Sequence, residues 1–220
     1  MSSSNGLRVS ILRDARLAVG SYQHWYGRDP ESSLPLCSHC NRPLDLVFDF
    51  DLSDPLLEFL RLGQSGRLKV ISCLGCDLPY AGQLYYRTSD RDVEILRNEG
   101  STPFQPWDTA LPRSAVLLAP VPPEQRRDSF SSEDEWREAV EFSEIPLHQL
   151  GGSPFWVQDE IDVPCCECTS RMRLLGQVAS ETWPVGDTDL LAGHMFGDMG
   201  MIYIHFCDSC RVLATGGSCY

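Results

Sequence analysis

The stretch GDMGMIYIHFCDSC, residues 197–210, combines a tight turn, a β-strand and a pair of cysteines. The same spacing, G-x-x-G-x6-C-x-x-C, occurs a second time from Gly63 to Cys76. Another C-x-x-C pair lies upstream of each copy, at Cys37 and Cys40 and at Cys165 and Cys168. The four pairs therefore form two quartets, one in each half of the chain.

The residues around the upstream pairs also match. The shared apolar positions are Leu44, Leu46, Val47 and Phe50 after Cys40, and Met172, Leu174, Leu175 and Val178 after Cys168. Ahead of the pairs, Val19-Gly20-x4-Trp25 resembles Leu150-Gly151-x4-Trp156. These matches predict an internal duplication of two units of about seventy residues. A unit of that size buries little surface and usually needs a cross-link such as a bound metal ion or a disulfide, which the cysteines would supply.

The predicted fold class is mainly β (α+β), an internal duplication of two antiparallel sheet units, each with a zinc-ribbon-like four-cysteine site. The expected strands are 7–11, 44–50, 68–72, 83–87 and 115–119, and the expected helices are 54–62 and 132–143. Residues 193–200 read as a hairpin turn. The predicted segments are an N-terminal tail and entering strand (1–18), a first zinc-binding repeat (19–97), a Pro-rich connection with an acidic helix (98–149) and a second zinc-binding repeat (150–220).

Zinc binding is the chemistry that the cysteines predict. Zinc takes four soft thiolates tetrahedrally, and a C-x-x-C turn brings two sulfurs to one ion. The duplication assigns the ligands to two structural zinc ions, with Cys37, Cys40, Cys73 and Cys76 at one site and Cys165, Cys168, Cys207 and Cys210 at the other. Sites that have lost zinc and reversible disulfides are the alternatives. Four sulfurs leave no open position for water or substrate, which argues against hydrolysis.

The remaining reactive residues form no catalytic pattern. Cys166 lies inside a pair and could compete as a ligand, and Cys219 reads as a free thiol. The five histidines do not form H-E-x-x-H, and we find no nucleophile elbow, phosphate loop or dinucleotide fingerprint. The sequence therefore predicts that the protein is not an enzyme and shows no evident small-molecule substrate, with an enzyme of unknown chemistry as an alternative.

Charge and hydropathy limit the partners. The formal net charge is −13, and zinc-bound thiolates would make it more negative, which disfavours nucleic acid and favours a basic protein partner. The N-terminus does not read as a secretory signal, and the longest apolar runs are strand-sized, so we expect no membrane insertion and a cytoplasmic location. The acidic helix from Glu133 to Glu144 is the expected contact surface, and a merely solvated face is the alternative.

Several segments of the second unit carry a family resemblance. They are residues 148–156 (HQLGGSPFW), the pair at Cys165 and Cys168, 174–177 (LLGQ), 197–200 (GDMG) and 203–207 (YIHFC). The chain resembles the YwqG-like family of uncharacterised bacterial proteins. It is also similar to the zinc-binding repeat of the programmed-cell-death-protein-2 family, with its Gly-Gly-x-Pro-x-Trp and paired knuckles. The first unit departs, with residues 20–25 reading GSYQHW and Asp49 where Gln177 stands.

The resemblance implies a binding protein. It links the eukaryotic family to chaperoning of a basic ribosomal protein and the YwqG-like family to candidate immunity against bacterial toxins. Together with the charge, it predicts a non-catalytic, zinc-stabilised module that engages a basic protein. The role is either that of an immunity protein or, as the alternative, that of a chaperone-like binder.

Overall fold

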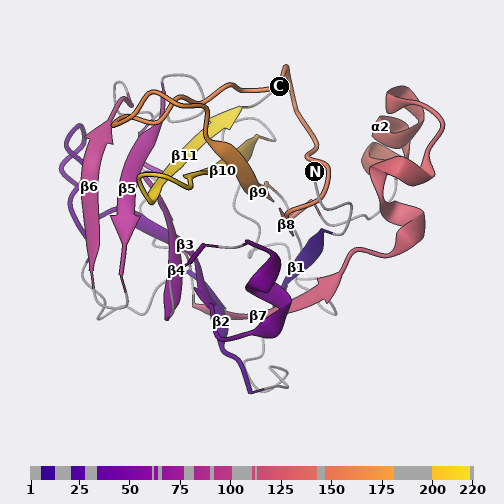
Figure 1. Ribbon diagram of the computed structural model, residues 1–220, viewed down its shortest axis with the longest axis horizontal. Helices are drawn as coiled ribbons and strands as arrows, with labels where there is room; N and C mark the ends of the chain where they lie inside the picture. The colour runs from indigo at the N-terminus through magenta and orange to yellow at the C-terminus, as the bar shows by residue number, and fades with distance from the viewer. Residues whose placement is uncertain are drawn as a thin grey trace.

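The chain folds into a single antiparallel sheet with short helices at its margins (Figure 1). The computed structural model describes residues 6–12, 21–27, 34–60, 62–63, 66–76, 82–89, 92–100, 111, 113–142, 147–180 and 200–218. The strands are β1 (Leu7–Leu12), β2 (His24–Tyr26), β3 (Asp45–Asp51), β4 (Arg67–Ser72), β5 (Leu84–Thr88), β6 (Val93–Asn98), β7 (Ser114–Pro120), β8 (Gln149–Leu150), β9 (Arg173–Ala179), β10 (Met201–Cys207) and β11 (Val212–Ser218). The helices are η2 (Pro55–Leu60), η3 (Pro123–Gln125), η4 (Arg127–Ser129) and α2 (Glu133–Phe142).

The sheet curls until it is nearly closed. Its eleven strands follow the order β4-β3-β2-β7-β1-β8-β9-β10-β11-β5-β6. β4, the first strand in that order, comes back against β5 and β11 near the other end. There the Ile71 N–H donates to Tyr86 Oη at 3.2 Å, and Thr215 Oγ1 donates to the Ile71 carbonyl at 2.8 Å. Because these groups are buried, the contacts satisfy polar atoms that would otherwise destabilise the closure.

The two halves of the sheet match strand by strand. The series β4-β3-β2-β7 corresponds to β10-β9-β8-β1, so a pseudo-two-fold axis passes between β7 and β1. Trp25 of β2 pairs with Asp49, and Gln149 of β8 pairs with Gln177. Asp49 and Gln177 are separated by 177 − 49 = 128 residues, the same offset as 168 − 40 = 128 between the second cysteines of the upstream pairs. This register is consistent with duplicated units.

The predicted mainly β fold, with one four-cysteine group in each half, is confirmed. The structure adds that both units belong to one sheet, because β1 pairs along its whole length with β7 and each of these strands then pairs with a strand of the other half. The proposed match of Trp25 with Trp156 is wrong, since the strand register places Gln149 at the Trp25 position. The segment boundaries remain a prediction, and the predicted turn at 193–200 lies, apart from Gly200, outside the described residues.

Hydrophobic residues pack on both faces of the curled sheet. The inner face holds the large core, in which Phe48, Phe50, Val70 and Ile204 are buried. On the outer face of β10 and β11 lie two smaller clusters, one around Val212 and the other around Trp136, Phe155 and Tyr203. All seven residues of β10 are buried, because this strand is covered on both faces. The second cysteine group lies beside the Val212 cluster.

The short helices begin where the sequence places their caps. Asp54 Oδ1 accepts the Leu56 N–H at 2.8 Å, and η2 that follows is a 3-10 helix where two α-helical turns were expected. Ser132 Oγ accepts the Glu135 N–H at 3.1 Å at the start of α2. The Glu135 carboxylate bonds to Ser131, one residue earlier than in a standard capping box. Trp136 and Val140 are buried on the inner side of α2.

Gly176 in β9 provides a test of the sheet packing. A Cβ atom at this position would lie 2.3 Å from the Gln149 carbonyl oxygen and 3.0 Å from Leu150 Cα, both backbone atoms of β8. We expect Gly176→Ala to lower the free energy of unfolding by about 2 kcal/mol or more, because neither strand can move away without disturbing its ladder. Gly75→Ala is the control, since its nearest neighbours are at 3.8 Å. Equal urea midpoints for the two variants would contradict this packing.

Candidate metal centres

Three of the four cysteine pairs share one backbone turn. The carbonyl of the first cysteine accepts the N–H of the residue four positions later, from Asn41 to Cys37, from Thr169 to Cys165 and from Arg211 to Cys207, at 2.8 to 2.9 Å. Asn41, Thr169 and Arg211 all have φ near +60°. This left-handed residue turns the chain sharply, so that both sulfurs of a pair point to the same side. At the fourth pair, where residue 77 lies outside the described ranges, the Cys76 N–H donates to the Cys73 carbonyl at 3.3 Å.

The turns bring the eight cysteines together in the predicted grouping. Cys37, Cys40, Cys73 and Cys76 form one group, and Cys165, Cys168, Cys207 and Cys210 form the other. Within each group the sulfurs all lie within 4.8 Å of one another, and the shortest separations are 3.5 to 3.6 Å. A tetrahedral ion with bonds of about 2.3 Å needs its sulfurs about 3.8 Å apart, whereas a disulfide needs about 2.05 Å. Each group could therefore hold a metal ion, and zinc fits the donor set.

The two groups differ in what surrounds them. Cys37, Cys73 and Cys76 belong to the large inner core, whereas Cys165 and Cys207 belong to the small cluster outside β11. Cys168 and Cys210 are half-buried, so the second group lies nearer the surface. A metal ion at the first group would consequently support more of the core than one at the second.

One hairpin contacts both groups. Strand β6 places Asn98 next to the first group, where its side-chain amide donates to Cys37 Sγ at 3.3 Å. The preceding residue, Arg97, points to the opposite face and donates to the Cys166 carbonyl at 2.9 Å. From β5, Arg87 donates to the Cys210 carbonyl at 3.3 Å and Tyr85 to the Pro164 carbonyl at 3.1 Å. The β5–β6 hairpin of the first half thus holds the knuckles of the second.

Each group contains one thiol with a lowered pKa. Burial opposes ionisation of Cys37, but hydrogen bonds from the backbone N–H groups of Cys40 and His39 prevail and lower its pKa to about 7. The hydroxyl and backbone N–H of Ser170 lower the pKa of Cys168 to about 6. Burial and the neighbouring sulfurs raise the pKa of Cys73 and Cys76. Cys37 and Cys168 are therefore the thiols of each group that most readily offer a thiolate to a metal ion, and binding displaces the protons that thiols such as Cys73 and Cys76 still carry.

The described histidines take no part in these groups. His24 has both ring nitrogens engaged, because Nδ1 accepts the Asp51 N–H at 3.1 Å and Nε2 contacts Asp54 Oδ2 at 3.0 Å. His148 occupies the corresponding position in the other half, and its Nδ1 accepts the Ala179 N–H at 3.0 Å. Both are buried, and burial lowers the pKa of each. His24 therefore has no free nitrogen with which to act as a general base.

Sequence reasoning missed several residues of these sites. Asn98 and Ser170 bond to ligand sulfurs, but a single Asn or Ser carries no spacing signal that distinguishes it from others. The match of His24 with His148 was also missed, because the strands β2 and β8 are too short to show a pattern. Cys166 is half-buried, next to the second group and outside it, and Cys219 lies beyond the described residues.

Comparison with known proteins gives a distant relative. No family model matches the chain. The chain is 24% identical over 188 residues to the uncharacterized protein YpfL of Salmonella typhimurium, a match covering 81% of this chain. It spans about two fifths of that relative, 38% of its length. The resemblances to the YwqG-like and programmed-cell-death-protein-2 families therefore remain hypotheses from sequence motifs. None of the helices in the described ranges is long and apolar enough to cross a membrane.

Proposed function

We propose that this protein is a non-catalytic module, stabilised by two structural zinc ions, that binds a basic protein partner. The observation that carries the proposal is the pair of all-cysteine groups, each with four sulfurs within 4.8 Å of one another. Zinc in such a shell has no open position, so it acts by stabilising the fold. The formal charge of −13 supports the choice of a basic partner, since opposite charges speed encounter.

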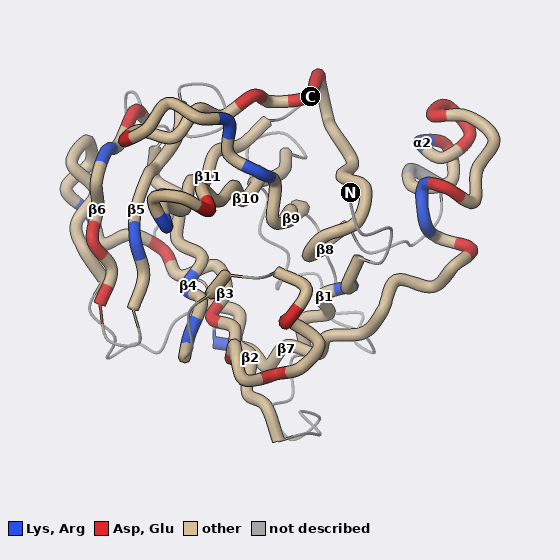
Figure 2. The backbone as a smooth tube through the Cα atoms, in the orientation of Figure 1, with Lys and Arg blue, Asp and Glu red and all other residues tan. Residues whose placement is uncertain are grey.

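The acidic helix α2 is the proposed contact surface. Trp136 and Val140 fix its inner face against Phe155 and Val157. Glu133 is neutralised locally by ion pairs with Arg127 and Arg137. Figure 2 shows that acidic and basic positions both occur along α2.

Asp134 and Glu138 are exposed on the same helix and form no ion pair among the described residues, which leaves their charge available to a partner.

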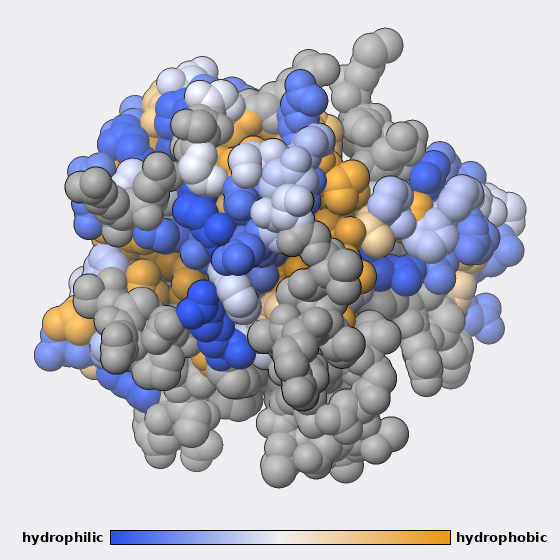
Figure 3. Space-filling model, turned by 90° about the horizontal axis from the view of Figure 1, so that it is seen from below, coloured by the Kyte–Doolittle hydropathy of each residue, from blue (hydrophilic) through white to orange (hydrophobic). Residues whose placement is uncertain are grey.

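The nature of the surface also favours a charged contact. On the face in Figure 3, hydrophobic side chains gather in separate areas bordered by hydrophilic ones, and the side that carries α2 is mostly hydrophilic. The exposed large hydrophobic residues Tyr22, Leu36, Leu56 and Leu117 come from different segments of the chain. A partner docking at α2 would therefore be recognised mainly through charge.

Two finer proposals follow from the sequence resemblances. The first is an immunity protein whose basic partner is a bacterial toxin. The second is a chaperone-like protein whose client is a basic ribosomal protein. Affinity capture at low salt separates them, because recovery of a nuclease or another toxin inhibited by this protein supports the first and co-purification of a ribosomal protein supports the second.

Reversing the charge of α2 tests the contact. We expect the double variant Asp134→Lys, Glu138→Lys to slow association with the captured and purified partner by about tenfold or more at about 0.05 M salt. The difference from the unaltered protein should shrink at about 0.5 M salt, where the Debye length is roughly 4 Å. Stopped-flow or surface-based association rates measure both effects.

The matched control is Asp159→Lys, a charge reversal at an exposed residue outside the helix. It should reduce the rate far less than the α2 variant. Equal effects of both variants would place the contact elsewhere, and a neutral or acidic partner would contradict the proposal as a whole. Neither outcome would bear on the zinc sites, which chelation tests separately.

A further inference from the structure

Strand β6 lies at one end of the sheet and contacts both cysteine groups. It is the last strand in the sheet order, and among the described residues it pairs with β5 alone (Figure 1). None of its six residues is fully buried. An edge strand with one neighbour and partly exposed side chains opens at a lower free energy than the strands inside a sheet. β6 therefore depends on contacts outside the strand ladder to stay docked.

Two adjacent residues of β6 reach one cysteine group each. Asn98 donates its side-chain amide to Cys37 Sγ at 3.3 Å, and its carbonyl oxygen lies 3.1 Å from His39 Nε2. Arg97, on the opposite face, donates to the Cys166 carbonyl at 2.9 Å. The contacts of Asn98 reach the upstream cysteine pair of the first group, and the contact of Arg97 reaches the upstream pair of the second group.

The apolar side chains of β6 divide in the same way. Val93 and Ile95 pack against the inner core, which contains three cysteines of the first group. Leu96 packs against the small outer cluster, which contains two buried cysteines of the second group. The docked position of β6 is therefore stabilised from both faces of the sheet, by the surroundings of one group on each face.

We propose that β6 couples the two metal centres, so that an ion bound at either group raises the affinity of the other group. The proposal rests on the two structural zinc ions of the proposed function. With an ion bound, Cys37 stays a thiolate, and an ionised acceptor strengthens the hydrogen bond from Asn98. At the second group, a bound ion fixes the turn that presents the Cys166 carbonyl to Arg97. Either ion thus orders β6, and the other ion then binds to a cysteine group whose contacts with β6 are already formed.

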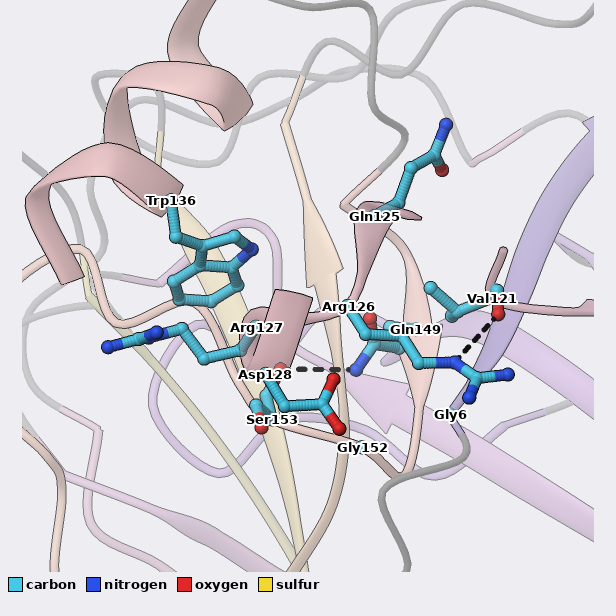
Figure 4. A pocket seen from close by; sticks show the side chains of 10 residues that line it. All are labelled: Gly6, Val121, Gln125, Arg126, Arg127, Asp128, Trp136, Gln149, Gly152 and Ser153. Atoms are coloured by element: carbon cyan, nitrogen blue, oxygen red, sulfur yellow. Dashed lines mark hydrogen bonds between the residues drawn. The ribbon is translucent and has the colours of Figure 1, made fainter. Parts of the chain in front are cut away.

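The cavity in Figure 4 contains an arginine that serves as a matched control. None of the residues that line this cavity belongs to either cysteine group or to β6. Arg126 donates through Nε to the Val121 carbonyl at 3.1 Å, on the opposite side of the cavity from Trp136 (Figure 4). Arg126→Met therefore removes a bond from an arginine to a backbone carbonyl, as Arg97→Met does, without removing a contact of β6.

Crossed variants of the reduced protein test the coupling. Asn98→Ala removes a contact to the first group, and Arg97→Met removes a contact to the second. We expect each variant to weaken zinc binding at the group it does not contact by about fivefold or more. The amide signals of Asn41 and Thr169, which close one turn in each group, report the occupancy of the two groups separately during a chelator titration. Arg126→Met should change neither midpoint.

A cysteine variant measures the coupling directly. With the second group disabled by Cys168→Ser, the zinc affinity of the first group should fall by about tenfold. The same substitution in an Arg97→Met background should change that affinity by about twofold at most, because the connection is already broken. The crossed variants retain all eight cysteines, so the test stands even where Cys168→Ser does not fold.

Three outcomes would contradict the proposal in different ways. Effects confined to the group that each variant contacts would overturn the coupling and leave the zinc sites intact. Equal weakening of both groups by Arg126→Met would also overturn it, because the groups would then communicate through the overall stability of the fold and not through β6. Fewer than two zinc ions in the unaltered protein would contradict the proposed function itself, and the coupling with it.

Discussion

Removal of zinc with a strong chelator is expected to unfold the reduced protein. Thiolate sites do not exist before the chain folds, so the free energy of metal binding, on the order of 10 kcal/mol per site in zinc-finger peptides, contributes to folding. Three cysteines of the first group lie within the large core, which would lose its support. Circular dichroism and amide exchange during chelation measure the loss, and elemental analysis should give about two zinc ions per chain beforehand.

The two sites should respond unequally. We expect Cys73→Ser to be the more damaging change, because Cys73 lies in the inner core, and Cys207→Ser to be the milder one, because Cys207 packs in the small outer cluster. Each variant should retain about one zinc ion. Since the β5–β6 hairpin contacts both groups, the two effects should not be additive in the double variant.

Cys166→Ser is the control for these variants. Its sulfur lies next to the second group and outside it, so zinc content and stability should change little. If the unaltered protein keeps its full stability in strong chelator, the prediction that the metal stabilises the fold is wrong. Loss of zinc from Cys166→Ser alone would show that Cys166 replaces one of the four assigned ligands.

The buried His148 is expected to make the protein sensitive to mild acid. Burial lowers its pKa to about 3, so the folded protein keeps the ring neutral while the unfolded chain binds a proton below its usual pKa of about 6.5. The stabilising contribution is therefore complete above pH 6.5 and falls by about 1.4 kcal/mol for each pH unit below it. Over the roughly three and a half pH units down to the folded pKa, the loss amounts to about 5 kcal/mol.

His148→Gln isolates this contribution from other acid effects such as zinc release. The glutamine oxygen can still accept the Ala179 N–H, and it does not titrate. We expect the variant to lose less stability than the unaltered protein between pH 7 and pH 5, by about 2 kcal/mol in urea unfolding at fixed zinc concentration. Parallel pH profiles for the two proteins would show that His148 is not buried in its neutral form.

The cysteine grouping could be predicted because its signal is local. Each C-x-x-C pair is visible as four adjacent letters, and the repeat alone decides which pairs belong together. Strand β3 and the start of the helix at residue 54 were predicted for the same reason, since alternation and capping are short-range patterns. The repeated motifs therefore allow the two cysteine groups to be predicted even though the order of the strands is unknown.

The topology could not be predicted, because pairing between distant strands leaves little trace in one sequence. β7 lies in a Pro-rich segment that reads as a connection, yet it pairs with both β1 and β2 in the middle of the sheet. β6 was missed, because its sequence VEILRN alternates weakly and none of its residues is fully buried. The unsatisfied nitrogen of His148 and the unpaired Trp136 N–H have no sequence signal, since burial depends on the whole fold.

β1 of the first half pairs with β8 of the second, and β7 of the second half pairs with β2 of the first. This exchange of strands has a consequence for folding during synthesis. When the ribosome has made residues 37–76, the four cysteines of the first group are all present and able to take up a metal ion. β1 and β2, in contrast, must wait for β7, which ends at Pro120, before either gains its central neighbour. A growing chain can therefore have its first cysteine group complete while the edges of β1 and β2 are still unpaired. These edges are open to aggregation, or to binding by a chaperone, until the second half of the chain has been synthesised.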